Sequence, residues 1–216
     1  VPAALADMGL APGQIDRHIG WDIGAFDLAE NLAARLDATL IAQRYSRLVI
    51  DCNRPWEADD LTPEVSDRTA VPANAALSDG ARRARWDEIH TPFHAAVSAA
   101  CDTRPKGLVS VHSYDPRREV DAGLRPWPVG LLFRRANPLA EALRSALAAD
   151  QRALPLGLNA PYEIEDASDY TIPVHGEGRG IPHVLLEVRN DFLRDARGIA
   201  EMADMLAGAL DRVALT

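Results

Sequence analysis

The chain has 216 residues and a formal net charge of −9, from 32 acidic side chains against 23 lysines and arginines. This balance argues against a nucleic-acid-binding protein, because neutralising phosphates requires a basic face. Apolar residues make up 47% and charged residues 25% of the chain, as in an ordinary globular protein. No apolar run approaches the ~18 residues of a membrane span, so we expect neither nucleic acid nor membrane as a partner.

The chain contains two cysteines, Cys52 and Cys101. Two are too few for a disulfide-held secreted scaffold and are usual for a reduced cytoplasmic enzyme, although one bridge between them stays open. No flexible linker divides the chain, so we predict a single domain over residues 1–216. The sequence opens at Val1 without an initiator methionine, and we expect that an N-terminal segment of the domain is missing from it.

The first predicted element is an amphipathic helix over residues 22–38, where apolar residues recur at three- and four-residue spacing. Two short aliphatic runs follow at 39–43 and 47–51, and we predict that they form neighbouring strands. The polar stretch 57–74 contains two prolines and no sustained periodicity, which predicts a long surface loop.

Next comes a basic helix that begins near Asp79, with Ser78 or Asp79 as its N-cap, and that buries a stripe ending at Val97. Pro92 lies inside this helix and should kink or split it. The remaining elements are predicted in the order strand 107–112, strand 129–133, helix 138–149 capped by Asn137, strand 154–159, strand 183–188 and terminal helix 197–213.

This alternation of strands and helices indicates an α/β fold. Because several strands are apolar on both faces, we predict a central mixed, largely parallel sheet flanked by helices on both faces, as in phosphorylase-like and hydrolase-like folds. In open sheets of this kind, ligands bind beyond the carboxyl ends of the strands. The polar residues expected there are Asn53, Arg54, His112, Glu187 and Arg189.

Glu187 and His112 are the two residues whose positions say most about chemistry. Glu187 interrupts an apolar strand, where an unpaired charge is strongly disfavoured, so it needs a partner or a raised pKa. Either condition suits a general acid or base, and the alternative is a buried ion pair with Arg189 on the same strand face. His112 ends its strand and could offer one ring nitrogen to a metal. The alternative is a hydrogen bond into the following loop.

Three further residues each allow two interpretations. Arg54 is biased toward an extended backbone by Pro55, and its guanidinium could bind a substrate carboxylate or form a surface salt bridge. His90 and His94 are four residues apart on the predicted helix. The glutamate of the helical zinc motif is absent there, so we expect packing and hydrogen bonding instead of metal binding.

Loop and helix-start residues complete the set of candidates. His175 lies on a Gly-rich loop that could close over a pocket, although the loop lacks the Lys-Ser/Thr of a phosphate-binding loop. We expect Asp22 to be first an N-cap and only second a site residue. Cys52, next to Asn53, is expected to be a buried strand residue and no nucleophile.

Several short blocks run in order over nearly the whole chain and are specific in combination. The blocks are HIGWDIGA (18–25), YSRLVIDCNRPW (45–56), VPANAAL (71–77), VSVHSYDP (109–116), RPWPVGLL (125–132), NAPY (159–162) and YTIPVHGEGRGIPHVLLEVRNDF (170–192). Together they resemble the N-formylglutamate amidohydrolase family. Members of this family are zinc-dependent hydrolases similar to zinc carboxypeptidases and aspartoacylases, with an α/β sheet sandwiched by helices.

The resemblance implies a metal-assisted amide hydrolysis. His112 would be a ligand of the cofactor Zn²⁺, and Glu187 would activate the metal-bound water. The substrate would be a small N-acyl acidic amino acid, with N-formyl-L-glutamate cleaved to formate and L-glutamate, a step of histidine degradation. The resemblance also implies five substrate-binding residues, which are Asn53, Arg54, Arg125, His175 and Arg189.

Relatives carry two earlier metal ligands in a His-Ala-Ser-Asn-like segment, just before a stretch that resembles VPAAL. Because VPAAL opens this chain, we expect those ligands upstream of Val1 in the full protein. Two alternatives stay open. One is the same fold acting on another N-acyl amino acid or small peptide, and the other is a metal-free relative that binds an anionic ligand through Arg54, Arg125 and Arg189. The sequence leaves the oligomeric state open.

Overall fold

A computed structural model describes residues 1–121, 123–135, 137–152 and 154–214. Its centre is a four-stranded sheet in the order β3-β6-β4-β5. Strand β6 runs parallel to β3 and antiparallel to β4, and β4 runs parallel to β5, which confirms the predicted mixed sheet. The strands are β3 (Leu108–Tyr114), β4 (Val129–Leu132), β5 (Leu156–Leu158) and β6 (His183–Arg189).

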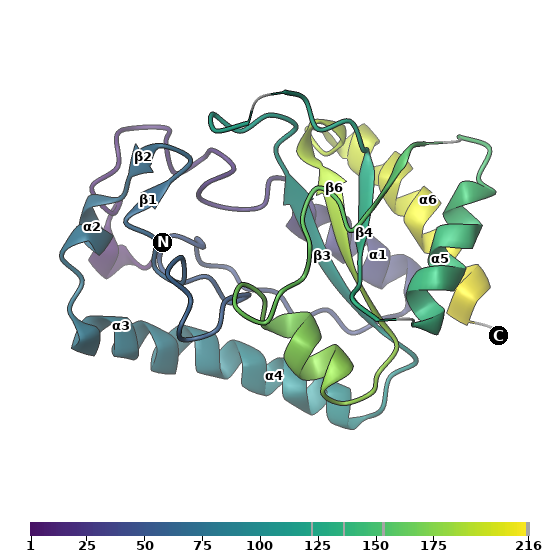
Figure 1. The fold of residues 1–216 in the computed structure, drawn as a ribbon, viewed down its shortest axis with the longest axis horizontal. Coiled ribbons are helices and arrows are strands. Elements are labelled where there is room, and N and C mark those ends of the chain that lie inside the picture. The colour runs from purple at the N-terminus through teal and green to yellow at the C-terminus, as the bar shows by residue number, and fades with distance from the viewer. Residues whose placement is uncertain (122, 136, 153, 215–216) are drawn as a thin grey trace.

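One face of the sheet is covered by three helices, which lie together beside β4 and β6 (Figure 1). Alternate residues of a strand point to opposite faces, and Val184, Leu186 and Val188 of β6 pack with these helices in the main core. The helices are α1 (Ala25–Leu36), α5 (Pro138–Ala148) and α6 (Ala196–Ala214). All three were predicted, and Asn137 caps α5 by accepting a hydrogen bond from the Ala140 N–H.

The opposite face of the sheet is covered by the π-helical turn η3 (Ile172–Glu177) and by α4 (Thr91–Asp102). Ile172 of η3 packs against Leu185 of β6, and Val97 of α4 packs beside Leu108 of β3. Helices therefore flank both faces, as predicted. Because Glu187 is two residues from Leu185, it lies on this second face.

The basic helix is split as the position of Pro92 predicts. It consists of α3 (Asp79–Arg85), the π-helical turn η2 (Trp86–His90) and α4. The Ser78 side chain caps α3 by accepting from the Ala81 N–H. The N–H of Thr91 donates to the carbonyl of Trp86, a wider π spacing just before the proline, which has no N–H to donate. The three elements form one long path along the edge of the molecule in Figure 1.

The prediction of two strands at 39–43 and 47–51 is wrong, since both runs are irregular. Their backbone groups bond to loops and turns: the Arg47 N–H donates to the Gly20 carbonyl and the Asp51 N–H to the Leu61 carbonyl. The aliphatic side chains of the second run are nevertheless buried, in a separate core with Met8, Ile19 and Leu61. An apolar run can thus be buried without pairing as a strand.

The remaining elements are short. The predicted loop 57–74 contains two paired strands of two residues each and the start of a four-residue helix. Within the described residues, no helix is long and apolar enough to cross a membrane. Cys52 and Cys101 are both buried and unbridged. The short elements are η1 (Ala3–Leu5), β1 (Val65–Ser66), β2 (Thr69–Ala70), α2 (Pro72–Ala75) and η4 (Asn190–Phe192).

Candidate active site

His112 and Glu187 lie side by side in the sheet, because β3 and β6 pair them in register. Neighbouring strands are about 4.8 Å apart, and directly paired residues of parallel strands project to the same face. Both side chains stand on the face away from α1, α5 and α6, near the carboxyl ends of their strands. The sequence therefore correctly predicts that these two residues come together.

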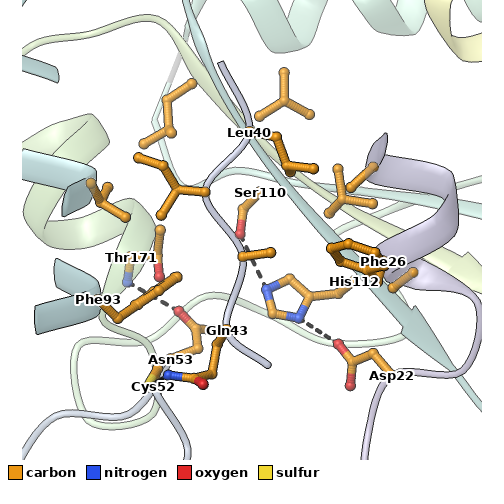
Figure 2. A pocket seen from close by; sticks show the side chains of 18 of the residues that line it. Asp22, Phe26, Leu40, Gln43, Cys52, Asn53, Phe93, Ser110, His112 and Thr171 are labelled. Carbon is orange, nitrogen blue, oxygen red and sulfur yellow. Dashed lines mark hydrogen bonds and ion pairs between the residues drawn. The ribbon is translucent and has the colours of Figure 1, made fainter. Parts of the chain in front are cut away.

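Asp22 holds His112 by a short hydrogen bond. The distance from its Oδ2 to Nδ1 of His112 is 2.7 Å, and the other ring nitrogen, Nε2, is 3.1 Å from Oγ of Ser110. Figure 2 shows these three side chains in one row across the groove. Asp22 does not cap α1: the N-cap is Gly24, and no side chain bonds there. The preference for an N-cap role of Asp22 is therefore wrong, because its carboxylate points to His112.

The carboxylate of Glu187 is buried and poorly partnered. Only 8% of the residue is exposed, and within the described part of the chain its Oε2 has no hydrogen-bond partner. The alternative of an ion pair with Arg189 is not realised, since the Arg189 guanidinium bonds to Asp191 at 2.8 Å. A carboxylate left in this state in a core is costly unless it serves a purpose.

Burial raises the pKa of Glu187 to about 7, although the positive charge of His112 acts against this shift. Burial by itself would lower the pKa of His112, but the hydrogen bond and charge of Asp22, with the charge of Glu187, raise it to about 9. Burial would likewise raise the pKa of Asp22, but His112 holds it below its usual value. The three groups thus form one coupled charge cluster.

Arg47 extends this cluster and was not singled out from the sequence. Its guanidinium donates to Asp51 at 2.6 Å and lies 3.4 Å from Asp22. Burial would raise the pKa of Asp51, but the charge of Arg47 lowers it to about 2. With 39% of its side chain exposed, Arg47 remains open to solvent. The only sequence signal is its place in the SRLVID run (46–51), where the arginine stands directly before the buried residues 48–51.

A groove of about 1880 Å³ leads to this cluster. Its polar lining near the cluster comes from Asp22, Arg47, Asp51, Ser110 and His112. The rest of its lining is mostly apolar, and Figure 2 shows Phe26 and Phe93 on its two sides with the segment of Leu40 and Gln43 between them. Glu187 lies one strand further into the sheet.

Asn53 and Arg54 occupy a turn beside the groove. The Asn53 Oδ1 accepts from the Thr171 N–H at 3.0 Å, and its Nδ2 donates to Asp169 at 2.9 Å. Asn53 lines the groove. The Arg54 guanidinium instead donates to Asp60 at 2.8 Å and to the Ser168 carbonyl at 2.6 Å. The structure brings Asn53 to the groove and directs the guanidinium of Arg54 elsewhere.

Arg125 and Arg189 lie on the Glu187 side of the sheet and are already partnered. Arg125 donates to the Tyr162 hydroxyl at 2.7 Å and to the Asp115 carbonyl. It is close enough to lower the pKa of Glu187 by its charge. Arg189 contacts Asp191 and the ring of Phe192. The charge of Arg125 therefore acts on the Glu187 carboxylate.

His175 is buried behind the Asn53 turn, with 3% of its surface exposed. Its Nε2 is 3.0 Å from Nδ1 of His94, whose Nε2 contacts the Cys52 carbonyl at 2.6 Å. His90 contacts the Arg54 carbonyl at 3.0 Å. The sequence-based expectation that His90 and His94 make hydrogen bonds and pack is therefore what the structure shows.

The fit of a zinc ion can be judged from the donors present. A carboxylate on one nitrogen of His112 is the usual arrangement of a ligating histidine. A catalytic zinc site needs about three protein ligands, however. Among the described residues, no three His, Cys, Asp or Glu side chains are grouped to hold a metal. The described donors alone therefore do not complete a zinc site.

The chain is an α/β protein in which a buried glutamate, a histidine and an aspartate form a candidate acid–base site. The sequence model of the N-formylglutamate amidohydrolase family matches residues 1–194. The chain belongs to this family, which makes it a hydrolase, as the sequence blocks predict. A search of curated proteins gives no match.

Two solved structures resemble the chain closely enough to compare. The gene product Atu2144 from Agrobacterium tumefaciens is 32% identical, with a TM-score of 0.91 over 99% of this chain and 85% of that chain. The N-formylglutamate amidohydrolase from Ralstonia eutropha JMP134 is 17% identical, with a TM-score of 0.64 over 97% of this chain and 88% of that chain. The second likeness is one of fold.

Proposed function

We propose that this chain hydrolyses N-formyl-L-glutamate to formate and L-glutamate. The observation that carries the proposal is the buried Glu187 carboxylate, whose Oε2 has no hydrogen-bond partner among the described residues, placed one strand from the His112–Asp22 pair. Membership of the N-formylglutamate amidohydrolase family supports the choice of substrate. The groove that ends at His112 is the route by which a small molecule would enter.

In this proposal, Glu187 moves a proton between water and the leaving group. It accepts a proton from the attacking water while the water oxygen bonds to the formyl carbon. It then gives that proton to the amide nitrogen as the C–N bond breaks, which yields formic acid and the amine. The acid proton then passes to the amine, so that formate and the ammonium form of L-glutamate leave. The carboxylate is returned unchanged. Asp22 orients the His112 ring beside the carbonyl that is attacked.

Zinc at this site is part of the proposal. His112 would supply one ligand, and further ligands would have to come from outside the described cluster, because that cluster does not provide three. When bound, the ion would lower the pKa of water and polarise the formyl carbonyl. Asp22 would then keep the His112 ring in the orientation that a metal ligand requires.

The substrate is an anion with two carboxylates, so cationic anchors are needed. Arg47 is the best placed, because it lines the groove beside His112 and stays partly exposed. Asn53 also lines the groove. The positive charge of Arg125 acts on the Glu187 carboxylate. Arg54, His175 and Arg189 are proposed to act behind these residues, because they are not among the residues that line the groove and their polar groups bond to other parts of the protein.

The proposal is tested by measuring formate release from N-formyl-L-glutamate, with and without added Zn²⁺ and with a chelator. N-acetyl-L-glutamate and N-formyl-L-leucine serve as matched substrates that change the acyl group and the side-chain carboxylate in turn. We expect N-formyl-L-glutamate to be preferred and the chelator to abolish turnover. Equal rates on N-formyl-L-leucine would contradict the substrate assignment, and full activity in chelator would contradict the role of zinc.

A further inference from the structure

His90 and His94 contact two alternate carbonyls of the same turn. The Nε2 atom of His94 is 2.6 Å from the Cys52 carbonyl, and Nε2 of His90 is 3.0 Å from the Arg54 carbonyl. These carbonyls flank Asn53 on both sides. The two histidines are four residues apart across the junction of η2 and α4, so both rings project from one side of this helix.

The partners determine where the protons lie. A carbonyl only accepts hydrogen bonds, so both Nε2 atoms carry hydrogen and donate. Nδ1 of His94 is then an acceptor, and it receives the Nε2–H of His175 at 3.0 Å. All three rings are buried, with 1%, 7% and 3% of His90, His94 and His175 exposed. Neutral imidazoles satisfy this chain of bonds.

Aromatic side chains hold the rings in this orientation. Trp86 stacks on His90 with ring centres 3.5 Å apart, and Tyr170 lies 4.4 Å from His94. Burial lowers the pKa of His90 to about 4 and that of His94 to about 3. The surroundings therefore favour the neutral, donating state that the two carbonyls need.

The clamped turn is connected to the groove through the backbone and the side chain of Asn53. The Asn53 N–H donates to Asp51 Oδ1 at 2.9 Å, and Asp51 Oδ2 accepts from Arg47 at 2.6 Å. The Asn53 side chain accepts from the Thr171 N–H (Figure 2). A shift of the turn would therefore move Asp51, Arg47 and Asn53 together.

We propose that His90 and His94 are positioning residues for substrate binding. By donating to the Cys52 and Arg54 carbonyls, they hold the turn so that Asn53 and Arg47 face the substrate in the groove. An apolar residue of the same size would fill the space but leave two buried carbonyls unsatisfied. This inference rests on the proposed function, since it concerns the binding of the same N-formyl amino acid.

The experiment compares His90→Leu and His94→Leu with His90→Gln and His94→Gln. Glutamine can place an N–H close to the position of Nε2, whereas leucine cannot. His183→Leu is the matched control, because His183 is also buried and contacts a backbone carbonyl, that of Ile181 at 2.8 Å, outside this turn. KM and kcat for N-formyl-L-glutamate are measured, with hydrogen exchange of residues 51–54 and 169–171.

We expect each leucine variant to raise KM about fivefold to tenfold, the effect of losing one buried hydrogen bond, and to change kcat by less than about twofold. Exchange should accelerate at 51–54 and 169–171 in these variants alone, and the glutamine variants should return KM close to the wild-type value. An unchanged KM, or equal losses in the leucine and glutamine variants, would overturn the proposal.

If the leucine variants do not fold, His94→Asn takes their place, because its amide reaches only the position of Nδ1. A higher KM for His94→Asn than for His94→Gln then supports the clamp, and equal values overturn it. Hydrogen exchange separates this inference from the proposed function. Wild-type protein without turnover would refute the function, and the exchange of the 51–54 turn would still decide whether the histidines hold it.

Discussion

His112 and the pair His90 and His94 have the same side chain, but their pKa values shift in opposite directions. His112 faces carboxylates, Asp22 at 2.7 Å and Glu187 on the neighbouring strand, which raise its pKa to about 9. His90 and His94 face carbonyls and aromatic rings, and burial lowers their pKa values to about 4 and about 3. At His112 the carboxylate partner outweighs the effect of burial, whereas at His90 and His94 the carbonyl partners do not.

The difference in charge separates the proposed reaction site around His112 from His90 and His94, which support the turn beside the groove. A charged ring next to an unpartnered carboxylate is an arrangement that stability alone does not favour, and it is typical of a reaction site. Neutral rings that donate to carbonyls satisfy groups that would otherwise be buried without a partner. The first group lines the groove through His112, while the second lies behind the turn that carries Asn53.

The largest expected effect in this comparison is that of His112→Gln. This variant removes the ring that faces the reacting carbonyl and that partners Asp22, so formate release should fall at least about 100-fold. Formate release by the His183→Gln variant, which changes a buried histidine of the neighbouring strand, should fall far less. A His112→Gln enzyme with near wild-type kcat/KM would place His112 in the same supporting class as His94.

A smaller effect is expected for Asp22→Asn. The amide keeps the size of the side chain but loses the charge that holds the His112 ring and contacts Arg47. We expect kcat/KM to fall about 10-fold to 100-fold, the range seen when a partner of this kind is removed. Steady-state kinetics together with a melting curve measure it. An activity loss that only parallels a loss of folded protein would argue against this orienting role.

The neutral histidines should make folding stability depend on pH. Unfolded imidazoles titrate near pH 6.5, so the unfolded state binds more protons than the native state between about pH 6.5 and about pH 4. The contribution of these two histidines to the unfolding free energy should therefore be constant above this window and should become destabilising as the pH drops through it. The charge of Asp51 opposes the shift at His90 but does not reverse it.

Urea unfolding at several pH values measures this dependence. His90→Gln and His94→Gln carry no titrating ring, so each should flatten the slope by up to about 1.4 kcal/mol per pH unit. The same slope in the wild type and in both variants would show that these rings are not neutral in the native protein.

The last expected effect concerns stability and compares a glycine beside Glu187 with one on α3. Gly130 of β4 pairs with Glu187, and a Cβ there would lie 2.2 Å from the Ala160 carbonyl oxygen. Gly130→Ala should therefore destabilise the protein by about 1–3 kcal/mol. Gly80 of α3 has no atom within 4 Å of such a Cβ, and Gly80→Ala should stabilise by up to about 1 kcal/mol. Thermal unfolding of both variants checks the contrast.

Periodicity predicts most of the fold correctly, because its signal is strong where one face is buried. Helices α1, α5 and α6 and the four strands of the central sheet lie where predicted, within a few residues. The run at 47–51 was misjudged because burial there comes from packing with Met8 and Leu61, not from strand pairing. Aliphatic composition alone does not separate these cases.

The site was predictable where a residue type contradicts its surroundings. Glu187 in an apolar strand is such a case, and the pairing of β3 with β6 places it beside His112. Asp22 was misjudged because a helix start favours a capping role, and its contact with His112 spans 90 positions of the chain. The directions taken by Arg47 and Arg54 depend on loop geometry that no local pattern encodes.

The central claim is that Glu187 carries the proton in hydrolysis of N-formyl-L-glutamate. The most direct test is formate release by wild-type protein and by Glu187→Gln at equal concentrations of folded protein. The substitution keeps the shape of the side chain but removes its ability to accept a proton, so kcat should fall by about 10²–10⁴ with KM little changed. A Glu187→Gln enzyme that releases formate at the wild-type rate would contradict the account.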